Sequence, residues 1–401
     1  MESIAFTQVA EEQLIEGLLK FSMPSLMDEQ ARRYLAAYPY KLESERIKVI
    51  REIINTLKPF NRSNILIDSF AAFEGFMLSI GKRDHFIHQF EVFLLGWYVF
   101  CTLSEKSTCQ TVPIEGFVPL EAEEIFLFWL ITAMTHDLGF PFQESPKIIE
   151  QLWRLHKDVK LTDIANLYYA FGKMLTSRDK NNHLPWIENL WKGRGKLINQ
   201  HLAIGLQHSL TIDYNGAMGL VQTIAAERDN HGYISSLLVG HALYPPENYE
   251  VPGIFTPDKL RSIHLYRLVL AAIALHHIKA DTPEHKNIIK KIKYTTNPFA
   301  YLLFIMDNVQ EWGRLSGIHV NDPTPMTFLT NCETKGMQIT LTFVTRHDLW
   351  ETKIRQKILK GIKAAKQRLK IPIGPGSGMK LKILYYFNDI KMKCPPLYLT
   401  I

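Results

Sequence analysis

An imidazole and a carboxylate stand side by side at the end of the most apolar helix that the sequence predicts. His136 and Asp137 follow the almost wholly apolar run 124–134, and Gly139 comes two residues later. We expect the run to form a buried helix and Gly139 to supply the backbone conformation that ends it. Strongly polar groups that emerge from a core need partners, and a divalent cation would satisfy both the imidazole nitrogen and the carboxylate oxygens. The pair therefore predicts one part of a metal site.

A second histidine lies upstream on another predicted helix. His88, Val92 and Leu95 share one face at spacings of four and three residues, which turns His88 toward the core. His85 lies one turn earlier and is the alternative ligand. The periodicity favours His88.

Three further groups lie downstream at the edges of apolar helices. His231 opens an apolar helix, His276 ends the apolar run 268–275, and Asp307 follows the apolar and aromatic run 299–306. A carboxylate after such a run is not expected in a core without a partner. His201 and His208, about one helix upstream of His231, are alternatives to it as a ligand.

The order of these groups along five helices resembles the pattern of the HD-domain superfamily of metal-dependent phosphohydrolases. The resemblance covers roughly residues 81–320 and depends on motif order and helical context. It implies two divalent ions, of Fe, Mn or Zn. His88, His136 and Asp307 would hold the first ion, Asp137 would bridge, and His231 and His276 would hold the second.

The resemblance also implies a reaction, the hydrolysis of a phosphoester by metal-activated water, with a nucleotide or cyclic nucleotide as the small-molecule substrate. Arg83, Lys279 and Arg314 lie beside the ligand motifs and are candidates to neutralise substrate phosphate. Two other functions use the same ligands or the same domain. One is a di-iron oxygenase, and the other is a nucleotide-binding regulatory protein.

The elements that must position these groups predict a mainly α protein in three parts. Residues 1–80 form an N-terminal helical region and residues 81–320 an HD-type helical bundle. Residues 321–401 form a small basic α/β appendage, with strands at 337–345 and 381–387 and a helix at 348–370.

Charge is distributed unevenly along the chain. Its formal net charge is +6, yet residues 351–401 carry 12 Lys or Arg against 2 Asp or Glu. The basic helix 348–370 is therefore compatible with two roles, a solvated charged surface, which is the commoner one, and a binding site for nucleic acid or another anionic partner. A homo-oligomer is also compatible with the sequence.

Membrane and export signals are not evident in the sequence. The longest apolar stretch, 92–103, is shorter than the ~20 residues that span a membrane, and the first residues do not resemble a secretory signal. The four cysteines have neither CxxC spacing nor the density of a disulfide scaffold. We therefore expect a cytoplasmic protein with free thiols.

Overall fold

The computed structural model describes residue 15 and several longer stretches of the chain. These are 29–38, 43–56, 84–106, 111–112, 114–116, 119–140, 194–227, 230–243, 259–278, 282–310, 326–335, 338–346, 380–387, 390–391 and 397–400.

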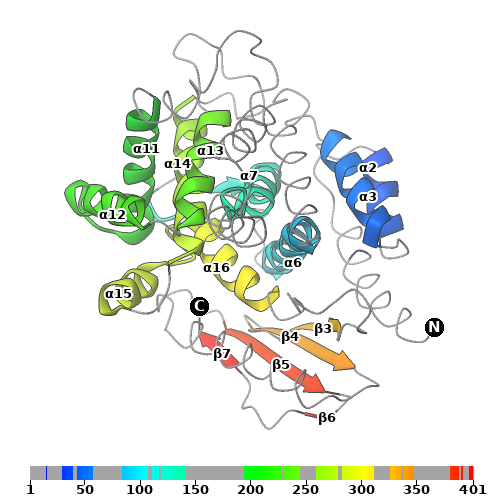
Figure 1. Ribbon diagram of the computed structural model, residues 1–401. Helices are drawn as coiled ribbons and strands as arrows, with labels where there is room; N and C mark the ends of the chain where they lie inside the picture. Colours follow the sequence, from blue (N-terminus) through cyan, green and yellow to red (C-terminus); the bar gives the residue numbers. More distant parts are fainter. Residues whose placement is uncertain are drawn as a thin grey trace, which may run out of the picture.

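Helices make up most of the described residues, which confirms the prediction of a mainly α protein (Figure 1). In chain order they are α2 (Glu29–Ala37), α3 (Glu43–Thr56), α6 (Asp84–Lys106), α7 (Ala122–Thr135), α11 (Arg194–Leu210), α12 (Tyr214–Ala226), α13 (His231–Leu243), α14 (Lys259–His276), α15 (Pro283–Lys291) and α16 (Pro298–Gln310).

Helix α14 lies at the centre of the bundle and packs against α7, α11, α13 and α16. Helix α6 packs on α7 and α16, and α3 attaches the α2–α3 pair to α6. Helix α12 packs on α11, on the left of Figure 1. The end of α7, the beginning of α13 and the end of α14 lie close to one another and to α6 and α16.

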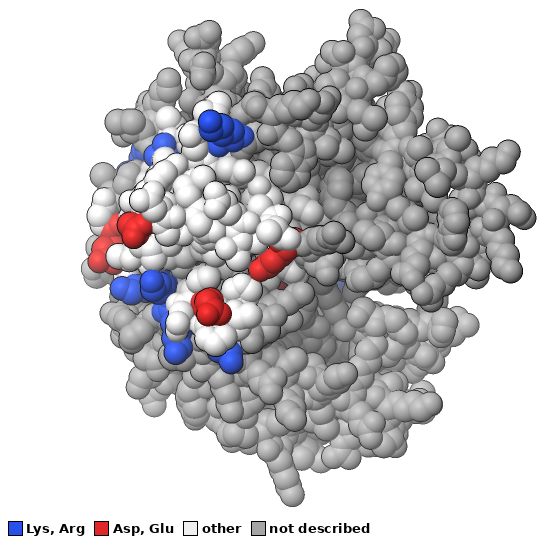
Figure 2. Space-filling model, turned by 60° about the vertical axis from the view of Figure 1, so that its left-hand side comes forward, with Lys and Arg blue, Asp and Glu red and all other residues white. Residues whose placement is uncertain are grey.

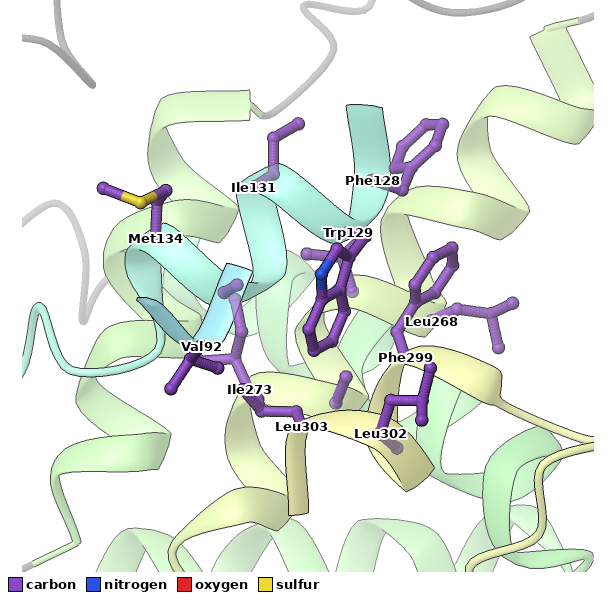
Figure 3. Packing of buried hydrophobic residues seen from close by; sticks show 14 of the residues in the cluster. Val92, Phe128, Trp129, Ile131, Met134, Leu268, Ile273, Phe299, Leu302 and Leu303 are labelled. Atoms are coloured by element: carbon purple, nitrogen blue, oxygen red, sulfur yellow. The ribbon is translucent and has the colours of Figure 1, made fainter. Parts of the chain in front are cut away.

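Apolar side chains from α6, α7, α14 and α16 fill the space between these helices (Figure 3). The described side chains of α7 are buried all round the helix, as expected for a helix enclosed by others. Trp129 fits against Gly96, where a Cβ atom would collide with the indole ring. The indole Nε1 donates a hydrogen bond to the Phe93 carbonyl oxygen at 2.9 Å. This contact sets the spacing of α6 and α7.

The beginning of α7 is fastened to α14 by polar groups. The Glu121 amide donates to Glu124 Oε2 at 2.9 Å in a capping box. Arg261, in the first turn of α14, donates to both carboxylate oxygens of Glu124 and to the Pro119 carbonyl. These bonds fix where α7 starts, and therefore where its last residues lie.

The described strands form two sheets. β1 (Thr111–Val112) and β2 (Leu120–Glu121) pair antiparallel just before α7. The larger sheet has the order β3 (Met326–Lys335), β4 (Gln338–Arg346), β5 (Lys380–Phe387), β6 (Ile390–Lys391), and β7 (Leu397–Thr400) also pairs with β5. β4 and β5 are parallel, and the other pairs are antiparallel.

The two predicted strands correspond to β4 and β5, whereas β3 was not predicted. The register of β3 against β4 shifts between Leu329 and Asn331, and such a bulge breaks the alternation by which a strand is recognised. The predicted basic helix 348–370 lies outside the described residues. The appendage as a separate α/β unit stays a prediction.

None of the helices in the described stretches is both long enough and apolar enough to cross a membrane.

Candidate metal centre

The structure brings the six predicted ligands together at the converging helix ends. His88 is on α6, His136 and Asp137 follow α7, His231 is the first residue of α13, His276 is the last of α14, and Asp307 is on α16. Five of them are buried and Asp307 is partly buried. Their ligand atoms form three overlapping groups that could hold a metal ion.

Two of the histidines are oriented by the helix ends on which they stand. His136 Nδ1 lies 2.7 Å from the Ala133 carbonyl oxygen, and His276 Nδ1 lies 2.5 Å from the Ile273 carbonyl oxygen. The last carbonyls of a helix have no partner within the helix. Because a carbonyl only accepts, Nδ1 is the donor in both rings. In the neutral ring Nε2 then presents a lone pair to the centre, as metal-ligating histidines do.

We call the predicted set His88, His136 and Asp307 the first ligand group. In the structure its members belong to two of the overlapping groups, one made by His88, His136 and Asp137 and the other by His136, His276 and Asp307. His88 Nε2 donates to Asp307 Oδ1 at 2.9 Å, and His136 Nε2 lies 3.4 Å from the same oxygen. His136 Nε2 is buried and makes no hydrogen bond within the described part of the chain. A buried ring nitrogen beside a carboxylate is a position that a cation would satisfy.

The second ligand group consists of Asp137, His231 and His276. Asp137 Oδ1 lies 3.2 Å from His231 Nε2 and 3.7 Å from His276 Nε2, and these two nitrogens are 3.1 Å apart. The other oxygen of Asp137, Oδ2, lies 3.5 Å from His136 Nε2 in the first group. Asp137 thus faces both groups, one oxygen toward each.

The spacing of the ligand atoms fits the coordination of small divalent cations. Nitrogen and oxygen ligands at about 2.0–2.2 Å from an ion lie about 2.8–3.6 Å from each other in tetrahedral or octahedral geometry. Five separations within the two groups run from 2.9 to 3.7 Å, and only the longest, from Asp137 Oδ1 to His276 Nε2, lies slightly beyond the expected range. Imidazole and carboxylate donors suit Fe, Mn and Zn.

Electrostatic coupling within the cluster is strong. Burial lowers the pKa of His136, but the carboxylates of Asp137 and Asp307 outweigh it and raise that pKa to about 9. Burial alone would raise the pKa of Asp307, whereas the neighbouring His136 and His88 rings lower it well below its usual value. Burial lowers the pKa of His231. Positive charge is thus favoured between the two carboxylates.

Two glycines allow the helices to approach closely at the centre. A Cβ atom on Gly139 would collide with the His231 carbonyl oxygen and lie 2.8 Å from the Ser235 amide nitrogen. A Cβ atom on Gly232 would lie 2.8 Å from the Ile273 carbonyl oxygen and 3.1 Å from His276 Cε1. The Gly139 amide donates to Ser235 Oγ at 2.7 Å. These contacts hold the His136–Asp137 turn against α13.

The role predicted for Gly139 was wrong. Among the described glycines only Gly116 has a positive φ, so Gly139 does not end α7 through a left-handed conformation. The physical requirement at Gly139 is close contact with α13, because any side chain would strike backbone atoms there. Sequence periodicity carries no information about such a contact.

The alternative ligands His201 and His208 lie elsewhere. His201 Nδ1 accepts a hydrogen bond from Arg267 Nε at 3.1 Å, and the His208 ring packs on His264 with centroids 4.7 Å apart. Both face α14 from α11. The side chain of His85 lies outside the described residues, as do the proposed phosphate-binding residues Arg83, Lys279 and Arg314.

Three residues near the cluster were not assigned roles from the sequence. The Asn230 side chain accepts from the Tyr233 amide at 2.9 Å and so caps the start of α13 at His231. The rings of His277 and His231 are 3.9 Å apart between centroids. Ser235 binds the Gly139 amide. The Asn-His pair before an apolar run is a capping signal, but the Ser235 contact is tertiary and has no sequence signal.

Comparisons with protein-family models, with curated proteins and with solved structures each found no match to this chain.

Proposed function

We propose that this protein is a metal-dependent phosphohydrolase of the HD-domain type, with an HD-type bundle at residues 81–320. The observation that carries the proposal is the position of Asp137, whose two carboxylate oxygens face two different groups of ligands. A bridging carboxylate between two imidazole-rich groups is the arrangement that a binuclear centre needs. The substrate class proposed is a phosphoester of a nucleotide or cyclic nucleotide.

Each of the six residues has a proposed role as a metal ligand. His88, His136 and Asp307 would hold one divalent ion, His231 and His276 the other, and Asp137 would bind both. When bound, such ions supply Lewis acidity that activates water and stabilises the attacking and leaving oxygens of a phosphoester. The Ala133 and Ile273 carbonyls keep His136 and His276 in the ligating orientation. Arg83, Lys279 and Arg314 are proposed to bind the phosphate oxygens.

The test is phosphate release from a set of nucleotides and from bis(4-nitrophenyl) phosphate, with Mn²⁺ or Fe²⁺ added. Asp137→Asn should abolish turnover, because an amide has one oxygen and no charge with which to bridge. Asp213→Asn is the matched control. Asp213 caps α12 by accepting from the Gly216 amide at 2.7 Å, and Asn caps equally well, so this variant should keep full activity.

The other functions are separated by the same preparations. Dioxygen consumption by the iron-loaded protein without phosphate release would replace the hydrolase with a di-iron oxygenase. Thermal stabilisation by a nucleotide without turnover would replace it with a nucleotide-binding regulator.

A further inference from the structure

A second cluster of titratable side chains lies between α11 and α14, on the far side of α14 from the metal centre. It consists of His201 and His208 on α11 and His264 and Arg267 on α14. Arg267 precedes His276 by nine residues, which places it about half a turn around the helix and ~13 Å along its axis. All four side chains are partly exposed, so the cluster reaches the surface. It forms no part of the metal site.

Arg267 has no carboxylate partner within the described residues. Arg46 and Arg261, which are also partly buried, pair with Glu91 and Glu124 respectively. The described partner of Arg267 is instead an imidazole, His201. Burial lowers the pKa of Arg267. A partly buried guanidinium normally pairs with an anion.

Most of the described face over α11, α12 and α15 is uncharged, with Lys and Arg side chains gathered at its lower left and a few Asp and Glu elsewhere (Figure 2). This face is therefore not a continuous basic surface.

The imidazoles add hydrogen-bond donors around Arg267. Because Arg267 Nε donates to His201 Nδ1, the neutral His201 ring carries its hydrogen on Nε2. His208 packs edge-on against His264, and its Nε2 is buried without a hydrogen bond within the described residues. Close packing of the two helices holds these groups in place, since a Cβ atom on Gly205 would collide with the Arg267 carbonyl oxygen.

We propose that this cluster binds an oxyanion of the phosphate class, with Arg267 as the charged anchor, His201 as a hydrogen-bond donor, and His208 as a second donor when its ring is protonated. A guanidinium matches the geometry of phosphate oxygens. An anion would neutralise Arg267 and give the buried His208 Nε2 a partner. The same chemistry is offered by inorganic phosphate and by the phosphate groups of a nucleotide.

Anion binding at this cluster should strengthen as the pH falls. Burial lowers the pKa values of His201, His208 and His264, and the charge of Arg267 lowers those of His201 and His264 further. Glu115 and the Thr296 backbone act in the opposite direction and raise the pKa of His208. The Tyr266 ring packs on His201. A bound anion favours the protonated rings, so binding takes up protons.

The test uses histidine-selective ¹³C NMR on the full chain, with the His208 signal assigned by its loss in His208→Gln. Because the histidines of the candidate metal centre give separate signals, phosphate binding at that centre can be distinguished from phosphate binding at the cluster between α11 and α14. Inorganic phosphate should shift the His208 signal, with a Kd weakened roughly tenfold or more by Arg267→Met. Lys291→Met removes one exposed charge from α15 and should leave that Kd within about twofold.

Two results would overturn the proposal. One is a His208 signal that does not respond to phosphate or nucleotide, and the other is an unchanged Kd in Arg267→Met. If Arg267→Met does not fold, Arg267→Lys keeps the charge but lacks the planar fork, and it should still bind phosphate more weakly than the parent. A nucleoside triphosphate that binds roughly tenfold more tightly than phosphate would identify a nucleotide as the source, and equal affinity would identify the free anion. Both results support the site.

Discussion

Replacing Gly232 by Ala should separate the effect of packing at the candidate metal centre from the effect of helix propensity on stability. Gly232 follows His231 in the first turn of α13. An added Cβ would lie 2.8 Å from the Ile273 carbonyl oxygen, 3.0 Å from His277 Cβ and 3.1 Å from His276 Cε1. The nearest obstacle is backbone, which cannot rotate away. Helix α13 must therefore shift from α14, and the 3.1 Å separation of His231 Nε2 and His276 Nε2 must change.

Gly219→Ala provides the matched control for the magnitude. Gly219 lies within α12, and nothing lies within 4 Å of an added Cβ. This variant should gain about 0.5–1 kcal/mol from helix propensity. Overpacking costs about 1–3 kcal/mol, so Gly232→Ala should be less stable than Gly219→Ala by at least that amount. Misplaced ligands should also weaken the binding of one ion by roughly tenfold or more.

The assay combines urea unfolding with elemental analysis of the three proteins. We expect Gly219→Ala to unfold at higher urea concentration than the parent with unchanged metal content. Gly232→Ala should unfold at a lower urea concentration than the parent and lose the metal ion of the second ligand group. If Gly232→Ala were as stable as Gly219→Ala and kept its full metal content, the close approach of α13 and α14 would not position the ligands, and our reasoning about the centre would be refuted.

Three further predictions concern strain and protonation. Thr211, in the turn after α11, has a φ of 52°, which a β-branched residue adopts only with strain. Thr211→Gly should therefore raise the free energy of unfolding by about 0.5–1 kcal/mol. A lower urea midpoint for this variant would contradict the prediction. Burial and the charges of His208 and Arg267 lower the pKa of His264 to about 4. Between about pH 6.5 and 4 the His264 ring is therefore neutral in the folded protein but binds a proton in the unfolded protein. Stability should therefore fall as the pH drops from about 6.5 toward 4, at less than about 1.4 kcal/mol per pH unit because the ring is partly exposed, and a His264→Gln variant with the same pH slope would exclude the effect. At the candidate metal centre, a cation must displace the proton of His136, whose pKa is about 9. Metal affinity, measured against a competing chelator, should therefore rise with pH up to about 9. A pH-independent affinity would contradict the geometry proposed for His136.

Helix class and the candidate ligands could be predicted from local patterns, whereas the division of the ligands into two groups was implied by the resemblance to the HD-domain superfamily. A polar residue at the edge of an apolar helix, such as His136 or His276, needs a partner, and five helices presenting such residues leave few ways to satisfy them. The periodicity of α6 indicates which face His88 occupies. These signals depend only on residues within one or two turns.

The remaining features depend on contacts between segments distant in sequence. Periodicity shows that His201, His208 and His231 each stand on a helix, but not which helix lies opposite, so the choice between them stayed open until the α11–α14 contact was known. The close approach at Gly139 and the bulge in β3 are likewise tertiary. The assignment of one Asp137 oxygen to each ligand group follows only from the atomic positions.

The most direct test of the proposed binuclear centre is the number of metal ions bound per chain, measured by elemental analysis of the parent and of Asp137→Asn after reconstitution with Mn²⁺ or Fe²⁺. Our account predicts close to two ions in the parent, because Asp137 presents one oxygen to each ligand group, and fewer than one in the variant. A parent that binds no metal after reconstitution would contradict it and leave a cluster of six polar groups in a helical protein without a catalytic centre.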